Sequence, residues 1–341
     1  MLEQGLRLTV FAGREAHALL AAELEGAGVV RVPVNARSRV RRVLAEQTLL
    51  PTAARRAGID LLHNTLNTAP AIAGLPQVTT IHDVIYKRFP ETAGLLNVGV
   101  AVLVPLAARR SSRVLTDSEA SKADIVRFLS VEPGRVDVVP LGPGIPVPAE
   151  PVSEAEVRAD LGLGGAPIVL TVAAKRPHKN LARLIDAIGR VAEDVTLVVP
   201  GFETQFEDEL RRAAGERVRF LGWVDDRVLD GLYRAATCFV LPSLAEGFGL
   251  PVLEAMLRGT PVGCSRISAL PEVAGEAAVY FDPLDSSEIA AAVARLLGDA
   301  QLRESLREAG LKQAERFSWE SAAERTIASY ERALAGSSTR S

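Results

Sequence analysis

The sequence predicts an α/β protein with two domains, each built around a parallel sheet. At 341 residues the chain is too long for one small core, and its length favours about two domains of ordinary size. Hydrophobic residues make up 48% of the chain and charged residues 24%, which is typical of a folded globular protein. Apolar runs of strand length alternate with helix-like segments along almost the whole chain, and this alternation indicates parallel strands connected by helices.

The strand-like runs fall into two groups. The first group is Arg7–Ala12, Ile59–Asn64, Gln77–Asp83 and Ser112–Ser118, and the second is Pro167–Ala174, Val195–Gly201, Arg217–Trp223, Thr237–Ser243 and Thr260–Ser265. Between the groups, Val138–Val157 is rich in Pro and Gly and indicates an inter-domain linker. We therefore expect two Rossmann-like domains, residues 1–148 and 149–316, that face one another across a cleft and bind ligands at the carboxyl ends of their strands.

Charge and composition argue against several kinds of partner. The net charge of −3 provides no global positive field for nucleic acid. Cys238 and Cys264 lie in apolar runs, so we expect buried thiols in a reducing cytoplasm. Met1–Arg7 lacks a charged start followed by an apolar core, so we expect no signal peptide. The apolar part of Leu95–Arg110 is too short to span a bilayer, so this segment predicts a core helix kinked at Pro105, with contact to a membrane surface as the alternative.

The stretch LAEGFGLPVLEAMLRG, Leu244–Gly259, carries the most informative pattern. It follows the buried strand Thr237–Ser243 and predicts a turn and then a short helix with Pro251 at its first position. A turn in this setting presents backbone N–H groups and the positive end of a helix dipole, which suit a phosphate. Gly247 and Gly249 carry no Cβ, so their amides can approach an anion closely.

Two glutamates flank this turn, Glu246 and Glu254. Acidic side chains form hydrogen bonds with vicinal hydroxyls, as the ribose-binding acid of dinucleotide folds does. The pair therefore suits a ligand with sugars on both sides of a diphosphate. The alternative is that Glu254 only complements the helix dipole from the first turn while Glu246 faces water, and the segment alone does not decide between these interpretations.

Two further clusters lie at predicted strand ends. Cations that could neutralise a diphosphate as its bond to a sugar breaks follow Pro167–Ala174; they are Lys175, Arg176, His178 and Lys179. A solvated basic loop is the alternative. His82 and Asp83 end Gln77–Asp83 and are either site residues or structural ones. The chain has no dinucleotide fingerprint, phosphate-binding loop motif or His-Glu-x-x-His, and no Asp-x-Asp pair for a divalent metal, so we expect neutralisation by cations and helix ends.

These segments together resemble the retaining family 4 glycosyltransferases, which have two Rossmann-like domains (the GT-B type) and use nucleotide sugars without a bound metal. Ala245–Val262 resembles their E-x7-E signature. The other matching segments cover both halves of the chain; they are Thr79–Asp83, Leu115–Leu129, Pro177–Ala187, Arg219–Ala236 and Ser268–Asp285. The resemblance implies that residues 1–148 form the acceptor-side domain and residues 149–316 the nucleotide-sugar-binding domain. It also implies a final helix, residues 317–335, that crosses back to the N-terminal domain.

The resemblance also implies a role for each matching residue. Glu246 and the amides of Phe248 and Gly249 contact the donor sugar, Leu250 lies beside the diphosphate, and Glu254 binds the ribose. Lys179 binds the diphosphate and His82 lies near the reacting sugar. The donor is a GDP-, UDP- or dTDP-sugar, and the leaving phosphate helps to deprotonate the acceptor on the same face of the sugar.

The chain departs from this family at two points. An arginine usually stands where this chain has Ala174, and Arg176 or Lys175 is our suggested replacement. The chain also begins at what resembles the second strand, so we expect the first strand and a glycine-rich loop to be missing. The leading hypothesis is a cytoplasmic transferase, at the inner face of the membrane or free of it, that moves mannose, rhamnose or a similar hexose to a glycan or lipid-linked acceptor for cell-surface polysaccharide. A non-catalytic sugar-nucleotide-binding subunit and an epimerase are the alternatives.

Overall fold

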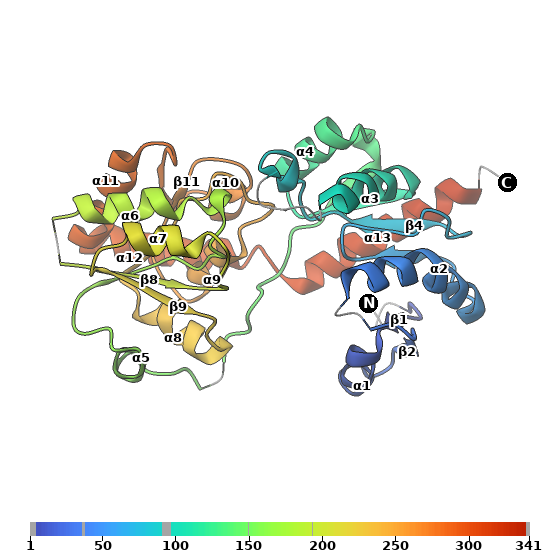
Figure 1. Cartoon of the computed structure of the whole chain (residues 1–341), viewed down its shortest axis with the longest axis horizontal. Helices are drawn as coiled ribbons and strands as arrows, with labels where there is room; N and C mark the ends of the chain where they lie inside the picture. The colour runs from blue at the N-terminus through green and yellow to red at the C-terminus, as the bar shows by residue number, and fades with distance from the viewer. Residues whose placement is uncertain (1–4, 36–37, 91–96, 149, 193, 339–341) are drawn as a thin grey trace. The chain divides into compact units, whose positions relative to one another are not determined.

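The chain folds into two compact units (Figure 1). This computed structural model describes residues 5–35, 38–90, 97–148, 150–192 and 194–338. Unit 1 comprises Met1–Val84, Gly94–Pro140 and Glu320–Ser341, and unit 2 comprises Ile85–Ala93 and Leu141–Trp319. Both are α/β bodies with parallel sheets, which confirms the predicted fold class.

Unit 1 contains two parallel sheets in its described part. One pairs β1 (Thr9–Ala12) with β2 (Gly28–Arg31), and the other has the order β3 (Leu62–Asn64), β4 (Gln77–Thr80), β5 (Arg113–Thr116) and β6 (Val136–Val138). Its helices are α1 (Arg14–Glu23), α2 (Arg39–Ala57), α3 (Asn97–Arg110) and α4 (Glu119–Leu129), together with the short 3-10 turn Pro133–Arg135. The 3-10 turn Ile85–Lys87 between β4 and α3 belongs to unit 2. The four-stranded sheet brings the carboxyl ends of β4 and β5 side by side.

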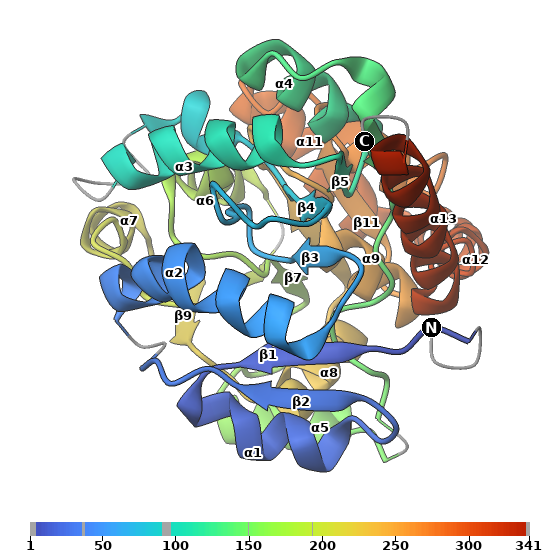
Figure 2. The same ribbon diagram turned by 90° about the vertical axis from the view of Figure 1, so that its right-hand side faces the viewer.

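The last helix, α13 (Trp319–Ser338), packs on unit 1, as the sequence predicts (Figure 2). Ala322 and Ala333 of α13 belong to the apolar cluster formed by Val78 of β4 and Leu115 of β5. Polar contacts hold the helix as well, because Ser329 Oγ donates to Asp137 Oδ2 at 2.6 Å and Arg332 lies 3.0 Å from Asp137 Oδ1.

The sheet of unit 2 has six parallel strands in the order β12-β11-β10-β7-β8-β9. The strands are β7 (Ile168–Leu170), β8 (Thr196–Pro200), β9 (Val218–Gly222), β10 (Cys238–Leu241), β11 (Val262–Ser265) and β12 (Ala278–Phe281). Starting from β7, the chain adds β8 and β9 on one side and then returns to add β10, β11 and β12 on the other. This is the strand order of a Rossmann fold, and its switch point lies between β7 and β10.

Helices cover both faces of this sheet. Alternate residues of each strand face opposite sides, so Phe239 and Leu241 pack toward α8 (Asp226–Ala235), α9 (Leu250–Leu257) and α10 (Leu270–Ala274), while Cys238 and Val240 pack toward α6 (Leu181–Arg190) and α11 (Ser286–Gly298). The remaining helices of unit 2 are α5 (Glu154–Leu161), α7 (Glu207–Ala213) and α12 (Ala300–Ala314). Helix α5 packs on α8, α7 on α6, and α12 on α9. Both cysteines are free and fully buried, and burial raises the pKa of the Cys238 thiol to about 12.

Local signals set several helix ends. Ser118, Asp225 and Asp285 cap α4, α8 and α11 with their side chains. Ser153 and Glu156 form a capping box at the start of α5.

The described part of the apolar segment Leu95–Arg110 forms α3, residues Asn97–Arg110, whose buried face includes Val104, Ala107 and Ala108. The first two residues of the segment, 95 and 96, lie outside the described residues. Within the described part of the chain, no helix is both long enough and apolar enough to span a membrane.

Candidate active site

The candidate site of unit 2 lies at the switch point of the sheet. The loop after β7, residues 171–180, and the loop after β10, residues 242–249, leave the carboxyl ends of neighbouring strands. The amide of Leu244 donates to the carbonyl of His178 at 2.7 Å, and Asn180 Nδ2 donates to the carbonyl of Pro242 at 2.9 Å. In open α/β sheets this is the place where ligands bind.

A buried ion pair joins these two loops. Lys179 Nζ lies 2.7 Å from Glu246 Oε1, and the side chains are 18% and 8% exposed. Ser243 Oγ donates to the same carboxylate oxygen at 2.6 Å, and Ser268 Oγ donates to the backbone carbonyl of Glu246 at 2.7 Å. The alternative in which Glu246 faces water is therefore wrong, because its carboxylate is enclosed and paired.

The basic loop contributes fewer cations than the sequence suggests. Lys175 is fully buried, and its ammonium donates to the carbonyl of Gly201 and lies 3.9 Å from Glu207 Oε2, so it holds the fold together. Burial also lowers the pKa of His178 to about 4, so this residue is neutral near pH 7 and the expectation of a cation here is wrong. Arg176, which is exposed, and Lys179 are the cations of this loop that reach its outer face.

The turn Gly247-Phe248-Gly249 presents backbone groups. Phe248 is 5% exposed and its ring packs edge-on against Phe317 at 5.6 Å, so only its main chain is available to a ligand. Gly249 has φ +108° and no side-chain cap, and a Cβ there would lie 2.8 Å from Leu270. α9 begins at Leu250, so Pro251 is its second residue and the predicted helix start is one residue late. The positive end of α9 therefore follows directly on the turn.

Glu254 lies in the second turn of α9, so the alternative that it complements the dipole from the first turn is wrong. Tyr233 Oη donates to Glu254 Oε2 at 2.9 Å, and the amide of Ile145 also donates to this carboxylate. Glu254 is only 5% exposed. Burial raises the pKa of Glu254, although the hydrogen bond from Tyr233 and the charge of Arg258 oppose the shift. A Cβ on Gly144 would lie 2.7 Å from Glu254 Oε1, so glycine at this position lets the chain pass close to the carboxylate.

Arg258, the residue that follows the end of α9, completes this network. Its guanidinium is fully buried, donates to Asp230 Oδ1 at 2.7 Å and reaches the carbonyls of Ile145 and Pro146 at 3.3 and 3.4 Å. Asp230 is also paired with Arg234 at 2.8 Å. The network anchors the segment before α5 to α9 and limits the freedom of the Glu254 carboxylate.

An exposed aromatic pair stands at the carboxyl ends of β8 and β9. The rings of Phe202 and Trp223 stack at 4.6 Å with an interplanar angle of 28°. Both side chains remain largely exposed, at 61% and 64%. Along this edge of the sheet, the order of features is therefore the aromatic pair, the cationic loop after β7, and the Glu246 turn after β10.

In unit 1, His82 lies after β4 and is hydrogen-bonded to Asp117, which follows β5. His82 Nδ1 is 2.9 Å from Asp117 Oδ2, and Nε2 is 3.2 Å from the carbonyl of Thr65. Because both ring nitrogens face acceptors, the geometry favours the doubly protonated ring. The hydrogen bond that His82 donates to the Asp117 carboxylate accordingly raises the pKa of His82. Asp83, its neighbour, also has an electrostatic effect on this ring.

The structure thus brings together Lys179 and Glu246, places Glu254 in its own buried network, and puts His82 in the other unit. Sequence reasoning did not single out Asp117, Tyr233 or Ser243. Asp117 stands at the end of the predicted strand Ser112–Ser118, which is the next strand along the chain after the one that carries His82. Its position at a strand end could therefore have identified it as a site residue. The described residues contain no group of three or more His, Cys, Asp or Glu side chains arranged for a metal ion.

Unit 2 thus combines a Rossmann-like sheet with a buried lysine–glutamate pair and a helix N-terminus at its switch point. Two family models match the chain: "Glycosyltransferase Family 4" over residues 1–143 and "Glycosyl transferases group 1" over residues 166–299. The chain belongs to the glycosyltransferases of the GT-B type and is a glycosyl-transferring enzyme.

Curated relatives support this assignment. The chain is 33% identical over 265 residues to O-antigen chain mannosyltransferase B of Escherichia coli, covering 74% of this chain and 69% of that protein. It is 34% identical over 308 residues to MMP alpha-(1->4)-mannosyltransferase of Mycolicibacterium hassiacum, covering 83% and 73%.

Solved structures share the fold. Sucrose-phosphate synthase from Thermosynechococcus elongatus superposes with a TM-score of 0.73 at 22% identity, covering 92% of this chain and 85% of that chain. Anabaena Alr3699/HepE in complex with UDP and glucose superposes with a TM-score of 0.73 at 23% identity, covering 95% and 90%.

Proposed function

We propose that this glycosyltransferase is a retaining, metal-independent enzyme that moves mannose, rhamnose or a similar hexose from a nucleotide sugar to a glycan or lipid-linked acceptor. The observation that carries the proposal is the Lys179–Glu246 pair beside the N-terminus of α9, at the switch point of the unit 2 sheet. The relatives named above are mannosyltransferases, one of them for an O-antigen chain, which supports a hexose donor and a role in cell-surface polysaccharide synthesis.

The diphosphate of the donor would occupy the space between the two loops. Lys179 has a flexible stem, so its ammonium can exchange Glu246 for a phosphate oxygen, with Arg176 as the second cation. The amides of Gly247, Phe248 and Gly249 and the first turn of α9, which begins at Leu250, supply further donors for the negative charge. Neutralisation of this charge without a metal is the electrostatic contribution that lowers the barrier.

In the reaction the bond from sugar C1 to the diphosphate oxygen breaks, and a bond from C1 to the acceptor oxygen forms on the same face. The acceptor proton passes to the departing diphosphate. Glu246, released from Lys179, would accept hydrogen bonds from the hydroxyls of the donor sugar, and no protein carboxylate acts as a nucleophile. Lys179 and Glu246 are therefore catalytic residues in this proposal because both contact the reacting groups.

The nucleoside would extend from the diphosphate toward β8 and β9. We propose that Glu254, oriented by Tyr233, accepts hydrogen bonds from the ribose. The exposed faces of Phe202 and Trp223 offer a surface on which a base can stack. For His82, we propose that the protonated ring lies near the reacting sugar and stabilises negative charge there.

A donor panel tests the proposal. UDP-, GDP- and dTDP-hexoses are incubated with the protein and with mannose-containing acceptors, in EDTA and with added magnesium or manganese. Mass spectrometry identifies a product, and NMR gives its anomeric configuration. We expect turnover in EDTA with the donor's configuration retained. A product with inverted configuration contradicts the retaining assignment. Activity that disappears in EDTA and returns with metal contradicts the metal-independent assignment.

Binding separates the enzyme from a non-catalytic subunit. Each donor is titrated calorimetrically and is also assayed for transfer and for hydrolysis by water. A donor that binds but gives no product in either assay would favour the sugar-nucleotide-binding subunit. Lys312→Met on α12 is a matched control for Lys179→Met, because Lys312 is an exposed lysine away from the site. We expect turnover to survive in the control and to be lost in Lys179→Met.

A further inference from the structure

Unit 1 has a central strand position that none of its described strands occupies. In unit 2 the strand order β9-β8-β7-β10-β11-β12 places β7, the first strand of the unit along the chain, in the centre. The described strands of unit 1 form two separate sheets, β2-β1 and β3-β4-β5-β6. Figure 2 shows β1 on the side of its pair that is nearer to β3. Arranged in the order of unit 2, these strands leave the central position between β1 and β3.

The edge of β1 that faces this central position has unpaired backbone groups. Successive residues of a strand direct their N–H and C=O groups to opposite edges. The carbonyls of Leu8 and Ala12 accept hydrogen bonds of 2.9 and 2.8 Å from β2 and from the residue after it. The backbone groups of Thr9 and Phe11 therefore lie on the other edge of β1, where they have no hydrogen-bond partner among the described residues.

The outer edge of β3 has the same feature. The amide of Leu62 donates to the carbonyl of Pro76 at 3.0 Å, on the side of β4. The backbone groups of Leu61 and His63 therefore lie on the edge away from β4, and within the described part of the chain nothing pairs with them. Unpaired N–H and C=O groups along a strand edge are a template for another strand.

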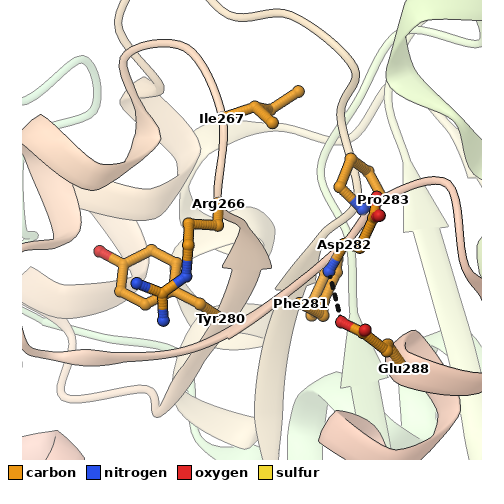
Figure 3. A pocket seen from close by; sticks show the side chains of 7 residues that line it. All are labelled: Arg266, Ile267, Tyr280, Phe281, Asp282, Pro283 and Glu288. Carbon is orange, nitrogen blue, oxygen red and sulfur yellow. Dashed lines mark hydrogen bonds between the residues drawn. The ribbon is translucent and has the colours of Figure 1, made fainter.

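Strand ends in unit 2 are satisfied, as the pocket beside β11 and β12 shows (Figure 3). The amide of Arg266, after β11, donates to the carbonyl of Phe281 at 3.1 Å. The amide of Asp282, after β12, donates to Glu288 Oε2 at 2.8 Å, which is the dashed line in Figure 3. The unpaired edges of β1 and β3 are therefore a local feature of unit 1.

The segment β1–α1–β2 also lacks the burial of a parallel sheet. Parallel strands are normally covered on both faces, and every residue of β10 and β11 is buried. In residues 9–31 only Ala12 is buried, while Val10 and Phe11 are half-buried. Helix α1 has no buried residue, and its Leu19 is 59% exposed. Because an isolated pair of strands is marginally stable in water, this segment would gain stability from a strand that joins it to β3.

We propose that the central position between β1 and β3 binds an extended apolar peptide segment of another polypeptide as an additional parallel strand. This strand pairs with Thr9 and Phe11 on one side and with Leu61 and His63 on the other, which joins the two sheets into one. Only a single strand can pair with both edges at once, whereas a second folded copy of the chain could offer its own sheet edge to one of them.

The neighbours of the central position define the chemistry of the segment. A strand in the middle of a parallel sheet is apolar on both faces, as is β7, whose three residues are fully buried. The segment is therefore about four to six residues long and rich in Val, Ile and Leu.

A peptide that copies β7 tests the proposal, because β7 lies between two parallel strands at the equivalent position of unit 2. The probe is Ala166–Val172 with two lysines at each end for solubility and a fluorescent label. The control is the same peptide with Val169→Pro, which removes a ladder donor. Fluorescence anisotropy follows binding to the whole chain. We expect the β7 peptide to bind and the proline peptide to bind at least about ten-fold more weakly. No binding, or equal binding of the two peptides, overturns the proposal.

Hydrogen exchange locates the bound peptide. We expect exchange in fragments that cover Thr9–Ala12 and Leu61–Asn64 to slow by about ten-fold or more when the β7 peptide is added. Exchange in Cys238–Leu241, the strand next to β7, should not change. Protection outside the two unit 1 fragments alone overturns the proposal. So does protection of Thr9–Ala12 that rises with protein concentration in the absence of peptide, since a second copy would then cover this edge.

Thr9→Pro tests the edge of β1 in the protein itself. Thr9 is the first residue of β1 and its N–H lies on the edge away from β2, so proline there leaves the β1–β2 ladder intact. We expect an unchanged Tm and about two- to ten-fold weaker binding of the β7 peptide, the effect of one hydrogen bond. Thr9→Ala keeps the amide and is the matched control. Equal peptide affinity of both variants and the wild type contradicts pairing at this edge.

Discussion

Replacing Tyr233 with phenylalanine tests whether the buried network positions Glu254. The change removes the hydroxyl that donates to Glu254 Oε2 at 2.9 Å and leaves the ring in place, at a position that is fully buried. A hydrogen bond to a charged group contributes about 1.5–3 kcal/mol to stability. At about 2–4 °C per kcal/mol for a unit of this size, Tm should fall by about 3–12 °C.

Nucleotide binding should weaken as well. Burial already raises the pKa of Glu254 above its ordinary value of 4.5. The protonated carboxyl therefore stabilises the folded state fully below pH 4.5. This contribution is lost as pH rises through the pKa that Glu254 has in the folded protein. Loss of the Tyr233 donor raises the folded pKa further. The variant should therefore bind UDP or GDP about ten-fold more weakly, roughly one hydrogen bond, with its pH dependence moved to higher pH.

The assay is calorimetric titration across a pH series together with thermal unfolding. Tyr330→Phe is the matched control, because the Tyr330 hydroxyl lies 2.7 Å from His63 Nδ1 in unit 1. The control should lower Tm without changing nucleotide affinity. If Tyr233→Phe also lowers Tm alone, with affinity and its pH dependence unchanged, Tyr233 is structural and does not position Glu254.

Three further predictions concern other parts of the two units. Lys179→Met should destabilise unit 2 by about 3–5 kcal/mol, because it leaves the buried carboxylate of Glu246 without its ion-pair partner. Adding Glu246→Gln to this variant should restore Tm but not turnover. His82→Gln should cost most stability below pH 6.5 and progressively less above it. The pKa of His82 is raised in the folded protein, so its contribution to stability is fully present below the unfolded pKa of 6.5 and is lost as pH rises through the folded pKa. A Tm difference between variant and wild type that does not depend on pH would contradict this. Trp223→Phe should remove the fluorescence change caused by UDP or GDP, whereas Trp319→Phe should keep it, and the reverse result would refute base stacking at this ring.

Much of the architecture could be predicted because its signals are local. Alternating apolar runs, Pro and Gly in the linker, and caps such as Ser118 act within a few residues, so the α/β class and most elements of unit 2 follow from short windows. The switch-point loops were also predictable, since strand ends and glycines mark them. The predicted first-turn position of Glu254 was wrong because a helix start can shift by one or two residues without changing the pattern.

Partner choice was decided only by the tertiary structure. Lys179 and Glu246 are 67 residues apart, and His82 and Asp117 are 35 apart, so their pairing depends on which strands become neighbours in the sheet. Burial likewise made His178 neutral and assigned Lys175 to the carbonyl of Gly201, although both belong to the same basic run in the sequence. The sequence by itself therefore determined which residue types stand at the strand ends. Only the folded chain determined which of them keep a charge and a free face, because desolvation and pairing depend on neighbours that are distant along the chain.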